Sequence, residues 1–391
     1  MRPRFTAYLA AAALADSGYW IYSVATGWLV ENATHAPLWL GIVNGAGNLP
    51  FLLFSLAGGV LADRFERRYV IAGGNGMLCA LVLLLAFLVA RGTLPIGLLA
   101  GFAFCVGTIN ALEHPVDRAW LYELIEGKQL GRSISLSSLE WAVARTFGPA
   151  LGGLAVAALG IAAGYAAYAL AVLPMLVLAL SVRTRTFGTA GASAEAQVPQ
   201  AAKERLPAAI LPFSLLIASF TICVTPYIAL LPDIAVRDFH LDARGFGLLA
   251  ACGGIGAIAG GILLSLLGEL RSKGRIVALT AFCGALLLVA FARTHDVRVA
   301  AVLLVAMGAV DTAMYALANT YVQQLASDRL RGRANAVFSL AFIGGIPIGS
   351  FALGALAQRV ENGPALILTG SLAALACLVF WSAAPAARDA A

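Results

Sequence analysis

Four acids and one arginine interrupt long apolar runs of the sequence, and the chemistry they offer is the binding and release of a proton. Asp16 lies in "AAALADSGYWIYSV", Glu113 in "GTINALEHPV", Glu140 in "SSLEWAV" and Asp311 in "LLVAMGAVDTAMYAL". Burial disfavours the charged form of a carboxyl group and a nearby arginine favours it, so Arg145, in "LEWAVARTFG", is a candidate partner that could switch. The alternative is a static ion pair that holds helices together.

Aromatic residues occur beside these charges. Tyr19 and Trp20 follow Asp16 within about one helical turn, and Tyr315 follows Asp311 in the same way, whereas Tyr227 lies in another apolar run. A concave site lined by rings and a few polar groups suits a large, semi-polar small molecule. The six cysteines and four histidines show no ligand spacing, so we expect no metal site, no cofactor and no disulfide.

The composition shows what kind of elements must hold these residues. Of 391 residues, 61% are hydrophobic and only 12% are charged, and the mean hydropathy is +0.87. A soluble domain carries roughly 25% charged residues, so this chain is predicted to be a multi-pass membrane protein. A charge deep in such a span costs about 2.5–3.5 kcal/mol, which makes each one a functional candidate.

Apolar windows long enough to cross a bilayer recur along the chain, and each is predicted to be a helix because lipid cannot satisfy backbone polar groups. The first begins like a signal peptide, but its apolar run resumes after Asp16, so we expect an uncleaved helix. The predicted domains are a six-helix bundle over 1–182, a polar linker over 183–206 and a second bundle over 207–391. The twelve windows are 5–30, 37–62, 69–90, 95–122, 133–158, 160–182, 207–231, 244–267, 275–293, 297–324, 333–357 and 364–384.

Lysine and arginine are distributed unequally between the two sides of these spans. If the N-terminus is cytoplasmic, nineteen of them lie on the cytoplasmic side and six on the far side, with Arg145 inside a span. Cytoplasmic loops carry the excess of positive charge, so both termini are predicted to be cytoplasmic. The net charge of +6 is therefore a signal of topology. We expect no nucleic-acid partner, because no basic stretch is interleaved with aromatic residues.

The two halves contain an internal repeat. Gly131 and Arg132 recur 201 positions later as Gly332 and Arg333, and Gly148 recurs as Gly349. The same offset places Asp311 on Asn110, so both halves put a polar group at that position. Parallel duplicated bundles with a substrate path between them are one of the architectures of transporters.

The charged stretch "GGVLADRFERR" is similar to the signature loop of the major facilitator superfamily, with Glu66 at a position where the family has glycine. The resemblance implies that Asp63 docks near the start of the helix in "RLRGR" and latches the halves together. It also implies a cavity lined by helices 1, 4, 7 and 10, which Asp16 and Asp311 would face. The latch residues are Gly59, Asp63, Arg64, Arg67, Arg68, Arg331 and Arg333.

The stretch "ARTFGPALGGL" resembles the helix 5 motif of superfamily exporters and antiporters, on Gly148, Pro149, Gly152 and Gly153. Glycines four residues apart allow close helix packing, and the proline kinks the helix. Together with "PVDRAWLYELIEGKQLGRSISL", the chain resembles the branch of macrolide efflux pumps and enterobactin-type siderophore exporters.

The resemblance implies a monomeric secondary transporter of the bacterial inner membrane, surrounded by lipid, that exports a small amphiphilic molecule in exchange for protons. The alternatives are a lipid transporter of the same fold, such as one for lysophospholipid, or a nutrient importer. An enzyme or an ATP-driven pump is disfavoured, because the sequence has no nucleophile–base set and no phosphate-binding glycine loop. A sensor would need a soluble signalling domain.

Overall fold

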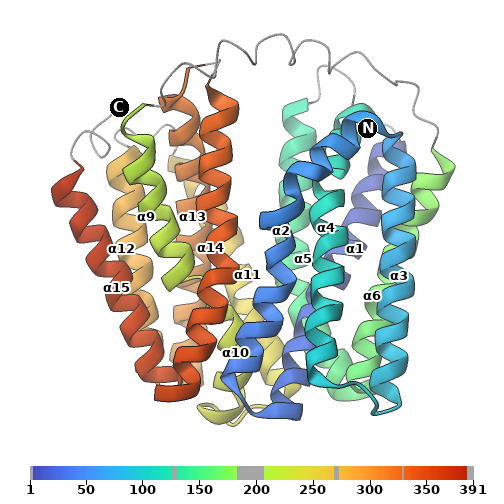
Figure 1. Ribbon diagram of the computed structural model, residues 1–391, viewed down its shortest axis with the longest axis horizontal. Helices are drawn as coiled ribbons and strands as arrows, with labels where there is room; N and C mark the ends of the chain where they lie inside the picture. Colours follow the sequence, from blue (N-terminus) through green and yellow to red (C-terminus); the bar gives the residue numbers. More distant parts are fainter. Residues whose placement is uncertain (1–2, 126–129, 183–206, 268–272, 328–329, 385–391) are drawn as a thin grey trace. The chain divides into compact units, whose positions relative to one another are not determined.

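The computed structural model describes the chain except for residues 1–2, 126–129, 183–206, 268–272, 328–329 and 385–391. The described residues form thirteen helices and no strand (Figure 1). The first six are α1 (Pro3–Thr34), α2 (Pro37–Arg64), α3 (Arg67–Ala90), α4 (Ile96–Leu124), α5 (Leu130–Leu159) and α6 (Ile161–Ser181). The others are α9 (Ile210–Cys223), α10 (Tyr227–Arg237), α11 (Ala243–Leu267), α12 (Lys273–Phe291), α13 (Val297–Leu325), α14 (Arg331–Val360) and α15 (Asn362–Ala383).

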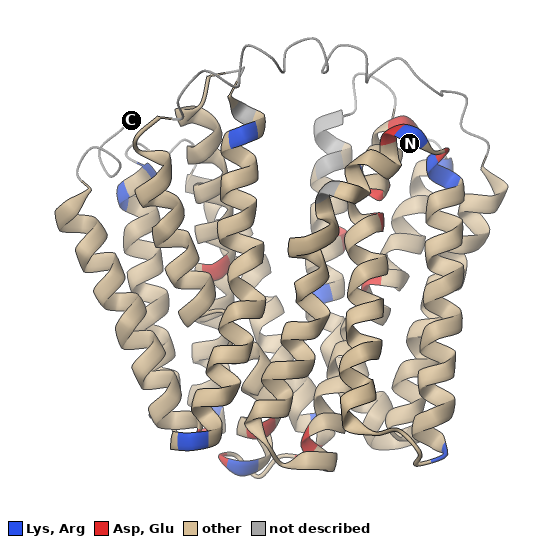
Figure 2. Cartoon of the chain, viewed as in Figure 1, with Lys and Arg blue, Asp and Glu red and all other residues tan. Residues whose placement is uncertain are grey.

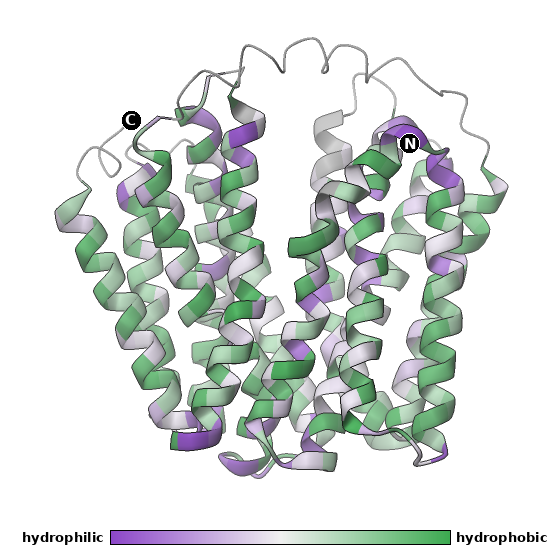
Figure 3. Cartoon of the chain, viewed as in Figure 1, coloured by the Kyte–Doolittle hydropathy of each residue, from purple (hydrophilic) through white to green (hydrophobic). Residues whose placement is uncertain are grey.

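Within the described residues, eleven stretches are long and apolar enough to cross a membrane, with α9 and α10 counted together and α1 outside that set. Their apolar side chains point outward as well as inward: Leu159 is 76% exposed and Leu266 is 78% exposed. Figure 3 shows hydrophobic residues around the helices rather than on one face of each. Helices that are apolar on all sides are expected where the surrounding solvent is lipid.

One predicted span differs from the structure. The window 207–231 was expected to be a single helix, but the chain forms α9 and α10 with an interruption at residues 224–226. Pro226 has no amide hydrogen to donate into a continuing helix. The second helix then continues to Arg237, which the sequence placed in a loop. The predicted linker, 183–206, lies outside the described residues.

The chain divides into two compact units. The first comprises Met1–Gly188 together with Leu231–Gly254, and the second comprises Thr189–Leu230 together with Ile255–Ala391. In the first unit α2 packs along α4, α3 along α6, and α1 against both α5 and α6. In the second, α12 packs against α13 and α15, and α14 packs against α9. The ends of α10 and α11 within 231–254 belong to the first unit, because α11 approaches α5 closely there.

The turn between α2 and α3 accommodates Glu66 without a left-handed backbone. Phe65 and Glu66 are the two residues between the helices, and both have negative φ, −118° and −64°. A glycine is needed only where φ is positive, so the departure from the family signature carries no backbone strain. The Glu66 carboxylate pairs with Arg68 Nε at 2.6 Å, which adds a local reason for its presence.

Candidate functional site

Four carboxyl groups from three helices form an acidic cluster in the first unit: Asp16 on α1, Glu113 and Asp117 on α4, and Glu140 on α5. Asp117 acts electrostatically on each of the other three. All four side chains are partly exposed rather than fully enclosed. Figure 2 shows acidic residues partway along the helices of this unit, whereas most lysines and arginines lie near helix ends.

The carboxyl groups of Asp16 and Glu140 lie close enough to act directly on each other. Two neighbouring carboxyl groups disfavour ionisation of both at once. The pair is therefore a place between α1 and α5 where a proton can bind. The sequence marks both Asp16 and Glu140 as charges inside predicted spans, but nothing in the local sequence of Glu140 shows that it faces α1.

Asp117 accepts a hydrogen bond of 2.6 Å from the hydroxyl of Tyr8 on α1. The Tyr8 ring packs edge-on against Trp120, with 5.8 Å between ring centroids, and both aromatic side chains are buried. Sequence reasoning missed Asp117. The available signal was its spacing, since it follows Glu113 by four residues and so shares a helix face with it.

Glu113 reaches from α4 to α3. Asn75 Nδ2 donates to its Oε1 at 3.1 Å and also to the carbonyl of Ile71 at 3.0 Å. The carboxyl group occupies space beside Gly74: a Cβ at residue 74 would lie 1.8 Å from Glu113 Oε1. The glycine thus opens room for the acid on the neighbouring helix.

Arg118 is the cation that acts on the acidic cluster in the described part of the chain, lowering the electrostatic cost of charge on Asp16, Asp117 and Glu140. Arg145, the partner proposed from the sequence, lies over aromatic rings. Its guanidinium carbon is 5.9 Å from the Trp20 centroid and 5.4 Å from the Trp141 centroid. Cations over tryptophan faces are stabilised by the ring quadrupole.

Aromatic hydroxyls extend the cluster toward α6. The carboxyl group of Asp16 acts electrostatically on the Tyr19 hydroxyl group. The Tyr19 ring packs edge-on against the Tyr168 ring, with 6.4 Å between ring centroids. Asn110 and Glu113, both on α4, lie close enough to Tyr168 to act on its hydroxyl group. The structure thus brings together four residues expected from the sequence: Asp16, Tyr19, Asn110 and Glu113.

In the second unit, Asp311 lines a small pocket beside the interruption between α9 and α10. Thr225 and Tyr227 line it from the interruption, and Gly284 lines it from α12. The buried Thr225 hydroxyl makes no hydrogen bond. Broken transmembrane helices free backbone polar groups, so the interruption can offer polar contacts beside Asp311.

Tyr315, one helical turn beyond Asp311, does not line this pocket. Its ring packs against Phe338 and Phe342 of α14, with centroid distances of 5.8 and 4.7 Å, and 44% of the residue remains exposed. The two predicted site residues on α13 therefore differ in their surroundings.

Charged residues of the α2–α3 turn make contacts within the first unit. Arg67 pairs with Glu123 and donates to the carbonyl of Ala119, so it ties the start of α3 to the end of α4. Arg68 lies over the Tyr69 ring at 4.4 Å. Asp63 and Arg64 are exposed. The latch with Arg331 and Arg333 at the start of α14 stays a prediction, and the Arg331 side chain is outside the described residues.

The glycines of the helix 5 motif lie at close helix crossings. A Cβ at Gly148 would meet Trp20 Cβ at 2.6 Å, and one at Gly152 would meet Ile21 Cα at 3.0 Å, both on α1. On another face, a Cβ at Gly153 would lie 2.9 Å from the Cα of Gly247 on α11. Pro149 sits inside α5 between these contacts. By contrast, Gly59, in the last two turns of α2, has open space around its Cβ position.

Long apolar helices, duplicated in sequence and carrying acids at depth, define a multi-pass membrane transporter. Solved structures of such transporters match the chain almost end to end. A D-xylose–proton symporter matches with a TM-score of 0.77, 14% identity and 98% of each chain covered. A POT family transporter in complex with a thioalcohol-conjugated peptide matches with a TM-score of 0.79, 12% identity, and 98% and 96% covered. At these identities the matches show the fold.

The chain belongs to the transmembrane secretion effector family of the major facilitator superfamily, whose model matches residues 2–390. A staphyloferrin A transporter of Staphylococcus aureus is 23% identical over 261 residues, which are 63% of each protein. The superfamily and the all-helical fold predicted from the sequence are confirmed. The chain is thus a multi-pass protein of the bacterial inner membrane, and it belongs to a superfamily whose members are small-molecule transporters rather than enzymes.

Proposed function

We propose that the protein is a proton-coupled exporter of a small amphiphilic molecule, a siderophore or a drug, and that it works as a monomer in lipid. The supporting observation is the acidic cluster, in which the carboxyl groups of Asp16 and Glu140 lie close enough to act on each other, an arrangement that disfavours ionisation of both. Four acids near one arginine can bind and release protons as their surroundings change. A site that couples proton movement to transport must bind and release protons in this way.

The arrangement we propose follows the sequence: twelve spans in two bundles, 1–182 and 207–391, joined by 183–206, with both termini cytoplasmic. Asp16, Tyr19, Asn110 and Glu113 would couple protons in the first unit, and Asp311 with Tyr227 would contact substrate in the second. Trp20, Arg145 and Tyr315 would line the path. Asp63 would latch the inward side through Arg331 and Arg333.

Export is favoured over import by two observations. The helix 5 motif of exporters is present, and its glycines lie at close crossings with α1 and α11. The family is described as one of secretion effectors. The partial match to a staphyloferrin A transporter makes a siderophore a reasonable first substrate to test.

The test is the accumulation of staphyloferrin A and of a macrolide in cells with and without the protein. We expect several-fold lower accumulation in expressing cells and loss of that difference on adding a protonophore. Asp16→Asn and Asp311→Asn should abolish the difference, whereas Glu361→Gln, at an exposed acid in the α14–α15 turn, should retain it. Higher accumulation in expressing cells would indicate import, and insensitivity to the protonophore would rule out proton coupling.

A further inference from the structure

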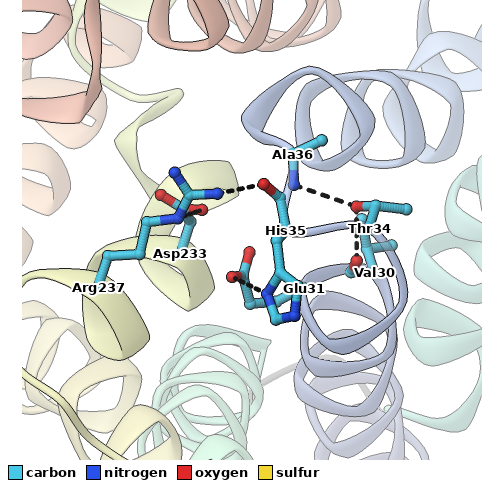
Figure 4. A network of polar contacts seen from close by, with 7 residues as sticks. All are labelled: Val30, Glu31, Thr34, His35, Ala36, Asp233 and Arg237. Carbon is cyan, nitrogen blue, oxygen red and sulfur yellow. Dashed lines mark hydrogen bonds and ion pairs between the residues drawn. The ribbon is translucent and has the colours of Figure 1, made fainter.

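A second pair of acids lies at the end of α1 that is far from the acidic cluster, and the proposed function does not use it. Glu31 of α1 and Asp233 of α10 are both 0% exposed. Their carboxyl groups lie close enough to act directly on each other. Figure 4 shows them side by side, with His35 and Arg237 around them.

The charges around this pair do not balance without a proton. Arg237 Nε pairs with Asp233 Oδ1 at 2.8 Å, and this supplies one positive charge for two carboxylates. His35, Asp233 and Arg237 are the titratable or charged groups that act on Glu31 in the described part of the chain. Two buried carboxylates side by side strongly disfavour double ionisation. The cluster becomes neutral when it holds one proton.

Glu31 presents an open acceptor for that proton. Its Oε2 atom is buried and has no hydrogen-bond partner, although leaving a buried carboxylate oxygen unsatisfied is costly. A proton on Oε2 would turn this atom into a donor, for which the neighbouring Asp233 carboxylate is an acceptor. The unsatisfied oxygen is thus a second indication, separate from the charge balance, that a proton belongs here.

His35 connects the buried pair to the surface. Its Nδ1 lies 3.2 Å from Glu31 Oε1, and its side chain is 65% exposed while that of Glu31 is fully buried. The backbone of His35 has φ of +47°, in the left-handed region. This conformation ends α1, and the carbonyl of His35 accepts a hydrogen bond from Arg237. The imidazole is therefore held between Glu31 and solvent.

We propose that Glu31, Asp233 and His35 form a proton-binding site in which the two acids share one proton and His35 relays it to solvent. On uptake, imidazolium Nδ1 gives its proton to Glu31 Oε1, which leaves a neutral ring with its proton on Nε2. Rotation of the Glu31 carboxyl group then places this proton on the side of the unsatisfied oxygen, and solvent at the exposed ring protonates Nδ1 again. Release runs through the same steps in reverse. The site rests on the geometry of α1 and α10 and stands whether or not transport is proton-coupled.

The test uses infrared difference spectra of the purified full-length protein between acidic and alkaline pH, in which protonated carboxyl groups absorb separately from carboxylates. Glu31→Gln and Asp233→Asn should each remove the same component of the protonated-carboxyl band, amounting to one carboxyl group. Asp16→Asn should leave that component in place. Glu361→Gln, at an exposed acid, is the matched control and should leave that component unchanged.

A relay role for His35 has its own readout. His35→Asn retains a residue that tolerates the left-handed region but removes the imidazole. The His35→Asn variant should keep the protonated-carboxyl component. The rate at which it releases the proton after a pH jump should fall several-fold. An unchanged band in both acid variants would overturn the shared proton, and an unchanged release rate would overturn the relay. If either acid variant fails to fold, the other acid variant still tests the shared proton, and His35→Asn still tests the relay. Transport insensitive to a protonophore, with the band intact, would reject only the proposed function.

Discussion

Glu113 illustrates how single residues create the acidic cluster. The sequence marks it as an acid in an apolar run, but its position depends on two residues of α3. Asn75 donates to its carboxyl group, and Gly74 leaves the space that this group fills. A hydrogen bond to a carboxylate stabilises the charged form, so Asn75 helps to set when Glu113 takes up a proton.

Replacing Gly74 tests this dependence. In Gly74→Ala the new methyl group would occupy the place of Glu113 Oε1, so the carboxyl group must move away from Asn75. Loss of a hydrogen bond to a charged group costs about 1.5–3 kcal/mol. We expect transport to fall several-fold while the protein still folds, because the displaced atoms are the far end of a flexible side chain. The measurement is substrate accumulation at matched expression.

The matched control is Gly76→Ala, on the same helix, where no atom lies within 4 Å of the Cβ position. This variant should transport normally. Equal transport by both variants would show that the place of the Glu113 carboxyl group does not matter.

At the scale of elements, α5 packs closely against α1 and α11, and glycines on two different faces of α5 form these contacts. Gly148 and Gly152 face α1, whereas Gly153 faces Gly247 of α11. The motif identified in the sequence thus fixes the distance of α5 from two neighbours. It also holds Glu140, on the same helix, beside Asp16. Packing and chemistry on α5 therefore depend on each other.

Gly153→Ala tests the crossing with α11. The added methyl group would meet backbone atoms of Ala243 and Gly247, which cannot rotate away. Overpacking of this kind costs about 1–3 kcal/mol. We expect a lower apparent melting temperature of the purified protein than for Gly261→Ala, a substitution on α11 with open space around it. Equal melting temperatures would contradict a tight crossing at this point.

At the scale of the whole molecule, the distribution of basic residues predicts the orientation in the membrane. The α2–α3 turn is basic and predicted to be cytoplasmic, whereas Arg91, at the end of α3, is predicted to lie on the far side. The cytoplasmic excess of lysine and arginine is the physical basis of this expectation.

Labelling from outside the cell checks the orientation. In a variant whose six cysteines are replaced by alanine, Arg91→Cys should react with a membrane-impermeant maleimide in intact cells. Asp63→Cys, which is also at an exposed position, should react only after the membrane is opened. The reverse pattern would place both termini on the opposite side.

The sequence by itself determined the membrane class, the helical fold and the superfamily, because these depend on hydropathy, span length and local motifs. It also identified Asp16 and Glu113, since an acid in an apolar run stands out without any knowledge of contacts. Only the tertiary structure decided which acids meet. Glu140 joins Asp16, Tyr8 joins Asp117, and Glu31 joins Asp233 across helices that are distant in sequence. A proton is shared only between groups within hydrogen-bonding distance, and packing rather than sequence spacing sets that distance.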